Sequence, residues 1–237
     1  MKRYTIVLGA LAALALPAHG ADLWNQESAF HTSGGAGFVD EEFSDFPTYS
    51  TYNVDDVIVG AGGWTVNQIQ TEVIATNTTA VTGITQARLN LFTNNGTSLP
   101  AAGNDPTTGS VVTVAVTADT NFTNVFYVTA SGLNLNLGAG EYWVGLSPLA
   151  SFSSQGETYI GYTNPPQNPA GANYFSAAEN PGGSFALAQG TGWGNYNGTN
   201  GYGAMDIQGT PAPEPASMAA LGVGVLALIR RRRSRKA

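Results

Sequence analysis

The chain of 237 residues contains no cysteine, and basic residues are nearly absent from its long central part. Without cysteine, neither a thiol nucleophile nor a disulfide is available, and a segment of about 190 residues is long enough to bury a core without one. From Asp22 to Thr210 there are fifteen acidic residues and a single basic one, Arg88, which gives a net charge of −14. Nucleic-acid binding and phosphoryl transfer both depend on cationic groups facing phosphate, so these functions are excluded.

Histidine is equally scarce, because the same segment contains only His31. A zinc site usually needs several His or Cys ligands, and a Ser-His-Asp triad would have to use this residue in its Gly/Ser-rich surroundings, where we expect an exposed loop. No Gly-x-Ser-x-Gly elbow occurs. We therefore expect no enzymatic activity. Glycoside hydrolysis by a pair of carboxylates is the one enzyme class that the composition leaves open.

The N-terminus has the three parts of a secretory signal peptide. Lys2 and Arg3 are followed by an apolar run from Tyr4 to Leu16, and small residues precede a cleavage position after Gly20, with cleavage after Ala21 as the alternative. We therefore assign residues 1–20 to a signal peptide, which signal peptidase removes during export.

The C-terminus holds a second ordered set of parts, assigned to residues 211–237. A Pro-rich stretch leads into twelve apolar residues at 218–229, which include Met218, Leu221, Val225, Leu228 and Ile229, and four arginines follow, Arg230, Arg231, Arg232 and Arg233. As a helix the apolar stretch rises about 18 Å, against a hydrocarbon core of about 30 Å. The arginines place the C-terminus in the cytoplasm and the main domain outside. This short transmembrane helix favours a processing signal over a lasting anchor, with a simple tail anchor as the alternative.

The residues Pro213, Glu214, Pro215, Ala216 and Ser217, the apolar stretch and the arginine cluster together resemble the PEP-CTERM sorting tail, which is also labelled "ice-binding protein C-terminal domain". The resemblance covers about 25 residues. It implies recognition by an exosortase and export to the cell envelope, its outer surface or the extracellular space, in a bacterium that makes exopolysaccharide. It implies nothing about ice.

Residues 21–210 show the period-two alternation of half-buried strands and no helical periodicity. Leu133, Leu135 and Leu137, for example, alternate with polar residues or glycine. We expect about nine strands, near 54–60, 63–75, 84–93, 111–117, 122–129, 132–137, 141–147, 157–162 and 203–209. A bulge near Asn67 and Gln68 would keep the longest strand in phase, and Gly138 to Gly140 would form a hairpin turn.

Many short antiparallel strands without helices predict an all-β, jelly-roll-like antiparallel sandwich, with a barrel or a short propeller as alternatives. Trp64 and Trp143 lie within predicted strands and are expected in the core. Residues 164–203 are rich in Gly and Pro, so we expect long loops there, which often carry binding sites.

Two groups of residues in this domain are candidates for binding. Asp55 and Asp56 are the first candidates for a structural Ca²⁺ site, because carboxylate oxygens suit this ion; otherwise the acidic residues only solubilise the surface. Trp193, Tyr196 and Tyr202 stand in a Gly-rich loop and could stack on sugar rings, whereas the alternative for Trp193 is a plug at the end of the sandwich.

These observations predict an exported, non-enzymatic surface or matrix protein with a structural or adhesive role in extracellular polysaccharide. The alternatives are a carbohydrate-binding module that uses the loop aromatics and a glycan-active enzyme with a carboxylate pair. The expected partners are signal peptidase, an exosortase-like enzyme and extracellular polysaccharide, and no cofactor other than calcium is implied.

Overall fold

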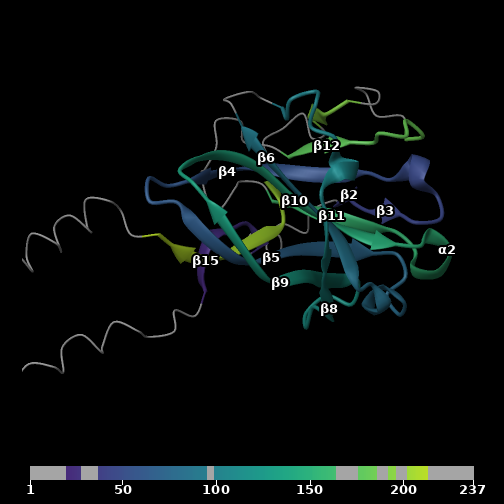
Figure 1. The fold of residues 1–237 in the computed structure, drawn as a ribbon. Helices are drawn as coiled ribbons and strands as arrows, with labels where there is room; N and C mark the ends of the chain where they lie inside the picture. Colours follow the sequence, from purple (N-terminus) through teal and green to yellow (C-terminus); the bar gives the residue numbers. More distant parts are fainter. Residues whose placement is uncertain are drawn as a thin grey trace, which may run out of the picture.

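The computed structural model describes residues 20–27, 37–94, 99–163, 176–185, 192–195 and 202–212. Over these ranges the chain is all-β and forms two mainly antiparallel sheets (Figure 1), which confirms the predicted fold class at this level. No helix in these ranges is long and apolar enough to cross a membrane. Residues 1–19 of the predicted signal peptide (1–20) and the apolar stretch at 218–229 lie outside the described residues, as does His31.

The first sheet is built around the long strand β5 (Trp64–Ala75). On one side β5 pairs with β9 (Val125–Leu137), and on the other side with β15 (Met205–Pro211) and β11 (Thr158–Thr163). Shorter strands extend the sheet at its margins: β1 (Ala21–Asn25), β2 (Gly37–Val39), β8 (Ala115–Ala118) and β14 (Tyr202–Gly203).

The second sheet has β10 (Gly140–Ala150) near its centre, between β4 (Tyr52–Val59) and β6 (Gln86–Asn94). Its outer strands are β7 (Ser110–Thr113), β12 (Ala177–Glu179) and β13 (Gly194–Asn195). The two-residue strand β3 (Glu42–Phe43) pairs in parallel with the end of β10.

One apolar core is shared by the two sheets. Val57 and Leu146 from the second sheet belong to the same buried cluster as Val66, Val73 and Ile207 from the first. Leu146, Val66 and Ile207 have polar or glycine residues on both sides, so the period of two in the sequence becomes one buried face per strand. Trp143 is fully buried, as predicted, whereas Trp64 is only partly buried against this core.

The predicted bulge in β5 is confirmed. The pairing of β5 with both β9 and β15 shifts between Val66 and Gln68, so that Asn67 is left over. This extra residue brings Val66 and Ile69 to the same buried face although they are three positions apart. On β9 the irregularity is matched by Gly132 at φ 72° and Asn134 at φ 54°, and the strands expected at 122–129 and 132–137 form one strand.

Two expectations about connectivity are wrong. Residues 138–140 do not form a hairpin, because β9 and β10 belong to different sheets and the turn crosses between them. The strand expected over 111–117 is divided at Val114 into β7 in the second sheet and β8 in the first. Alternation tells which side chains face the core, but it does not tell with which strand each one pairs.

The two ends of β5 mark the two ends of the sandwich. At one end Trp64 pairs with Leu137 and Pro211, and β1 joins the same end through the pair Ala21–Gly209. At the other end Ala75 pairs with Thr158, close to the short helices η2 (Pro47–Tyr49) and α2 (Phe152–Gln155) (Figure 1). A strand of this length extends about 36 Å.

Candidate functional site

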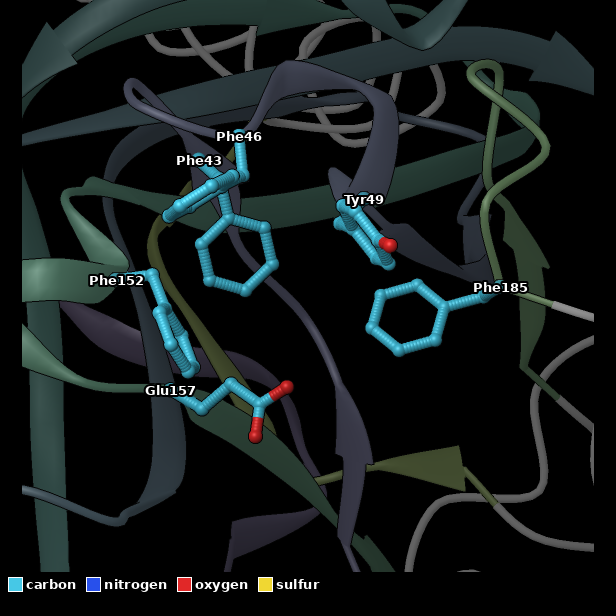
Figure 2. Close-up of a pocket in the computed structure, with 6 residues that line it drawn as sticks. All are labelled: Phe43, Phe46, Tyr49, Phe152, Glu157 and Phe185. Carbon is cyan, nitrogen blue, oxygen red and sulfur yellow. The ribbon is translucent and has the colours of Figure 1, made fainter.

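A groove with a volume of about 320 Å³ opens at the end of the sandwich where η2 and α2 meet (Figure 2). Phe46, Tyr49 and Phe152 remain 45 %, 44 % and 48 % exposed, which is unusual for side chains of this size. The groove is lined by five aromatic rings and one carboxylate: Phe43, Phe46, Tyr49, Phe152, Phe185 and Glu157.

The rings form two groups on either side of the groove (Figure 2). In one group Phe152 lies edge to face with Phe43 and with Phe46, at centroid distances of 6.0 and 5.9 Å. In the other, Tyr49 and Phe185 lie 5.5 Å apart at 87°. Edge-to-face contacts are a favourable geometry for aromatic pairs.

The position of Phe152 is fixed by Asp45, which lies before η2. Its carboxylate accepts hydrogen bonds from the backbone N–H groups of Phe152 and Ser153, both at 2.9 Å, and from the Ser151 hydroxyl at 3.0 Å. Desolvation acts in the opposite direction, but the hydrogen bonds from Ser153, Phe152 and Ser151 hold the pKa of Asp45 well below its usual range. Asp45 is therefore ionised, and its hydrogen bonds connect the segment before η2 to the start of α2.

The position of Phe185 is fixed by Asn180. The Asn180 amide donates to the carbonyl oxygens of Thr48 and Ser50 at 3.0 and 2.7 Å, and its own oxygen accepts from the Phe185 N–H at 3.0 Å. Gly182 lies against the same turn so closely that a Cβ there would be 2.3 Å from Thr48 Cα. This segment therefore packs directly on η2, and both sides of the groove are held by hydrogen bonds.

Glu157 supplies the polar group of the groove and stands just before β11. Its Oε2 accepts from the Tyr159 hydroxyl at 2.5 Å, and its backbone N–H donates to Thr76 Oγ1 at 2.8 Å. Burial and the bond to Glu157 raise the pKa of Tyr159 to about 12, so this hydroxyl keeps its proton at any physiological pH.

Two buried carboxyl groups lie behind the groove. Glu41 accepts from the backbone N–H and the hydroxyl of Thr158, at 2.7 and 2.9 Å, and Asp40 accepts from the Asn53 N–H and the Ser147 hydroxyl. Burial raises the pKa of Asp40 to about 7 and that of Glu41 to about 8. These residues connect strands inside the fold and do not act as solubilising surface charges.

Asp55 and Asp56, the candidate calcium ligands, are also buried. Asp55 on β4 accepts from the Ser176 hydroxyl and from the Gly203 N–H at 3.0 Å, and so connects the second sheet to β14 of the first. Burial raises the pKa of Asp55 to about 7. The parts of the chain that the structure describes contain no group of three or more His, Cys, Asp or Glu residues that could hold a metal ion.

Two of the three predicted sugar-stacking residues are buried, so that prediction is wrong for them. Tyr202 is fully buried, 5.8 Å from the Trp24 ring centroid, and Trp193 is 7 % exposed and donates its indole N–H to the Asn104 carbonyl at 2.7 Å. Trp193 contributes to a small cluster with Trp143, which matches the alternative that it plugs the end of the sandwich. Tyr196 lies outside the described residues.

Sequence reasoning missed the aromatic groove, because its residues come from segments far apart in the chain. A local signal existed in residues 43–52, where Phe43, Phe46, Tyr49 and Tyr52 recur every third position without strand alternation. Three of these four side chains line or approach the groove, and Tyr52 is buried.

The chain is thus an all-β, two-sheet protein with an aromatic groove at one end of the sandwich. Residues 211–233 match the family model of the PEP-CTERM protein-sorting motif, and the chain therefore carries this motif. The match spans the predicted sorting residues Pro213 to Ser217, the apolar stretch and Arg230 to Arg233. The motif is typical of proteins that are exported and sorted to the cell envelope. No curated protein matches the chain.

Proposed function

We propose that this chain is an exosortase-sorted protein of the outer cell surface or extracellular matrix, with a non-catalytic structural or adhesive role in contact with extracellular polysaccharide. The observation that carries the proposal is the PEP-CTERM motif at 211–233, directly after the last strand of a folded β domain. The sandwich is of jelly-roll type in this proposal, since the chain passes repeatedly from one sheet to the other between successive strands.

The position of β1 supports removal of the signal peptide after Gly20. β1 begins at Ala21, which pairs with Gly209 of β15. Cleavage after Gly20 keeps this pair, whereas cleavage after Ala21 removes it. On the C-terminal side, residues 218–229 hold the chain in the inner membrane, with Arg230 to Arg233 in the cytoplasm, until the exosortase acts.

The contents of the groove support a non-catalytic role. Glycoside hydrolysis uses two carboxyl groups on either side of the scissile bond. Among the described residues that line the groove, Glu157 is the only carboxylate. The nearby Asp45 already accepts three hydrogen bonds as the cap of α2.

The test is the fate of the tail in a bacterium with an exosortase system. The full chain and a Pro213→Ala/Pro215→Ala variant are expressed, the cell is fractionated, and both termini are located by mass spectrometry. We expect the unchanged chain at the outer surface or in the medium, without its signal peptide and its arginine cluster. The variant should stay in the inner membrane with its tail intact. The same location and the same termini for both proteins would overturn the proposal.

A further inference from the structure

We propose that the aromatic groove between η2 and α2 binds an uncharged polysaccharide strand. This inference deepens the proposed function and rests on it, since the proposed function supplies the contact with extracellular glycan. The main observation is that the half-exposed rings of Phe46, Tyr49 and Phe152 line the groove together with the carboxyl group of Glu157. Other aromatic side chains of the domain, such as Trp143 and Tyr202, are buried.

The groove combines the two kinds of contact that a sugar ring requires. A pyranose presents C–H groups on its faces and hydroxyl groups around its edge, so it stacks on flat rings and donates hydrogen bonds at its rim. Phe46, Phe152 and Tyr49 supply exposed rings on opposite sides of the groove. Glu157 supplies acceptor oxygens between them, of which the Tyr159 hydroxyl occupies one position.

The charge of the domain decides between glycan classes. An acidic polysaccharide would need Lys or Arg at the groove, and Arg88, the one basic residue between Asp22 and Thr210, is engaged by Glu42 and the Gly109 carbonyl. The charged group in the groove is Glu157, within a segment of net charge −14. Carboxylates or sulfates on the glycan would be repelled, so the glycan that fits is neutral.

Hydrogen bonds within the protein hold the segments that form the groove. Asp45 and Asn180 accept hydrogen bonds from the backbone N–H groups of Phe152 and Phe185, so the backbone that carries these rings loses little freedom when a glycan binds. The groove also lies at the far end of β5 from Pro211, where the sorting tail begins. A protein tethered by its tail therefore presents the groove away from the tether.

The experiment measures glycan binding by the full chain in lipid nanodiscs. Soluble dextran, galactomannan and hydroxyethylcellulose serve as neutral probes and alginate as the acidic one, with empty nanodiscs as the blank. We expect saturable binding of at least one neutral polysaccharide and none of alginate. Phe152→Ala and Tyr49→Ala should each lower the association constant about tenfold, in line with the contribution of one stacked ring.

Phe122→Ala is the matched control, because Phe122 is 41 % exposed but does not line the groove, and it should bind as the unchanged chain does. Circular dichroism of each variant verifies that the fold is retained. Glu157→Gln leaves the rings in place and should also weaken binding.

Three results would each overturn the inference: no neutral glycan binds, binding is unaffected by the groove variants, or the groove is covered by a second copy in a stable dimer. If sorting to the surface occurs but binding does not, this inference fails and the proposed function stands.

Discussion

Arg88 and Glu42 form a bidentate ion pair, with Arg88 Nε 2.7 Å from one carboxylate oxygen and Nη2 2.6 Å from the other. The two side chains are only 15 % and 19 % exposed, and the third guanidinium nitrogen donates to the Gly109 carbonyl at 2.8 Å. The pair fastens β3 to β6, which do not pair with each other directly. Because Glu42 precedes Phe43, the pair also anchors one of the residues that line the groove.

Replacement of Arg88 by Met should lower the free energy of unfolding by about 2 kcal/mol, because Glu42 then stays largely buried without its charged partner. Urea-induced unfolding followed by tryptophan fluorescence measures the loss. The double variant Arg88→Met/Glu42→Met should recover part of it, since neither charge then remains. A single variant as stable as the unchanged protein would show that the ion pair contributes nothing.

The folded domain should resist trypsin, because Arg88, its one basic residue, lies within a sheet. Arg88 lies within β6, between β7 and β10, so its peptide bond cannot enter a protease while the sheet is intact. For protein secreted without its tail, we expect no cleavage under native conditions and one cleavage, after Arg88, in urea. Mass spectrometry of the fragments gives the result. Cleavage after Arg230 to Arg233 would reveal that the tail is retained, and rapid native cleavage after Arg88 would contradict the position of β6.

The buried carboxyl groups should make the protein more stable in mild acid than at alkaline pH. Burial raises the pKa of Asp40 and Asp55 to about 7 and that of Glu41 to about 8, whereas the unfolded chain has values near 4. Between these values the folded state binds more protons, so stability falls as the pH rises from about 4 to about 8. A single carboxyl group whose pKa is raised by about three units contributes about 4 kcal/mol. We therefore expect a loss of at least that order over this range, measured by urea unfolding at constant ionic strength.

Asp55→Asn is the control for this pH dependence. The amide oxygen can still accept from Ser176 and Gly203 but no longer titrates, so stability should fall less steeply with pH. A free energy of unfolding that increases between pH 5 and pH 8 would contradict the assignment of these groups as buried and protonated.

Asp45→Ala should loosen α2 without unfolding the sandwich. The variant removes the acceptor for the Phe152 and Ser153 N–H groups, which then exchange with solvent more rapidly. Hydrogen exchange followed by mass spectrometry should show the change at 151–155 and leave β5 and β10 unaffected. Asp45→Asn keeps one acceptor oxygen, so its exchange at 151–155 should be intermediate between that of the unchanged protein and that of Asp45→Ala. Unchanged exchange at Phe152 would mean that ring contacts alone hold this side of the groove.

The sequence predicted those features that are determined by neighbouring residues. Alternation located β4, β5, β6 and β11 to within a few positions, and the phase change at Asn67 revealed the bulge. Short marginal strands such as Ala177–Glu179 were missed because three residues cannot show a period of two.

The groove could not be predicted because it depends on tertiary contacts. Phe43, Phe152 and Phe185 come together only when β3 and β10 pair and when Asn180 bonds to the turn at Thr48. The same limit explains the error at Trp193 and Tyr202, since glycine-rich surroundings suggested exposed loops. In the structure both rings are buried, Tyr202 in the main core and Trp193 in the smaller cluster with Trp143.

The placement of β15 determines how the domain responds to mechanical load. β15 is held between β5 and β1, and it runs toward the end from which the sorting tail leaves. A pull between an occupied groove and a tethered tail acts along the strand axis, whereas the hydrogen bonds of an antiparallel ladder are perpendicular to it. The bonds to both neighbours are then loaded together in shear instead of opening one by one, which is the arrangement in which a β-sheet best resists force.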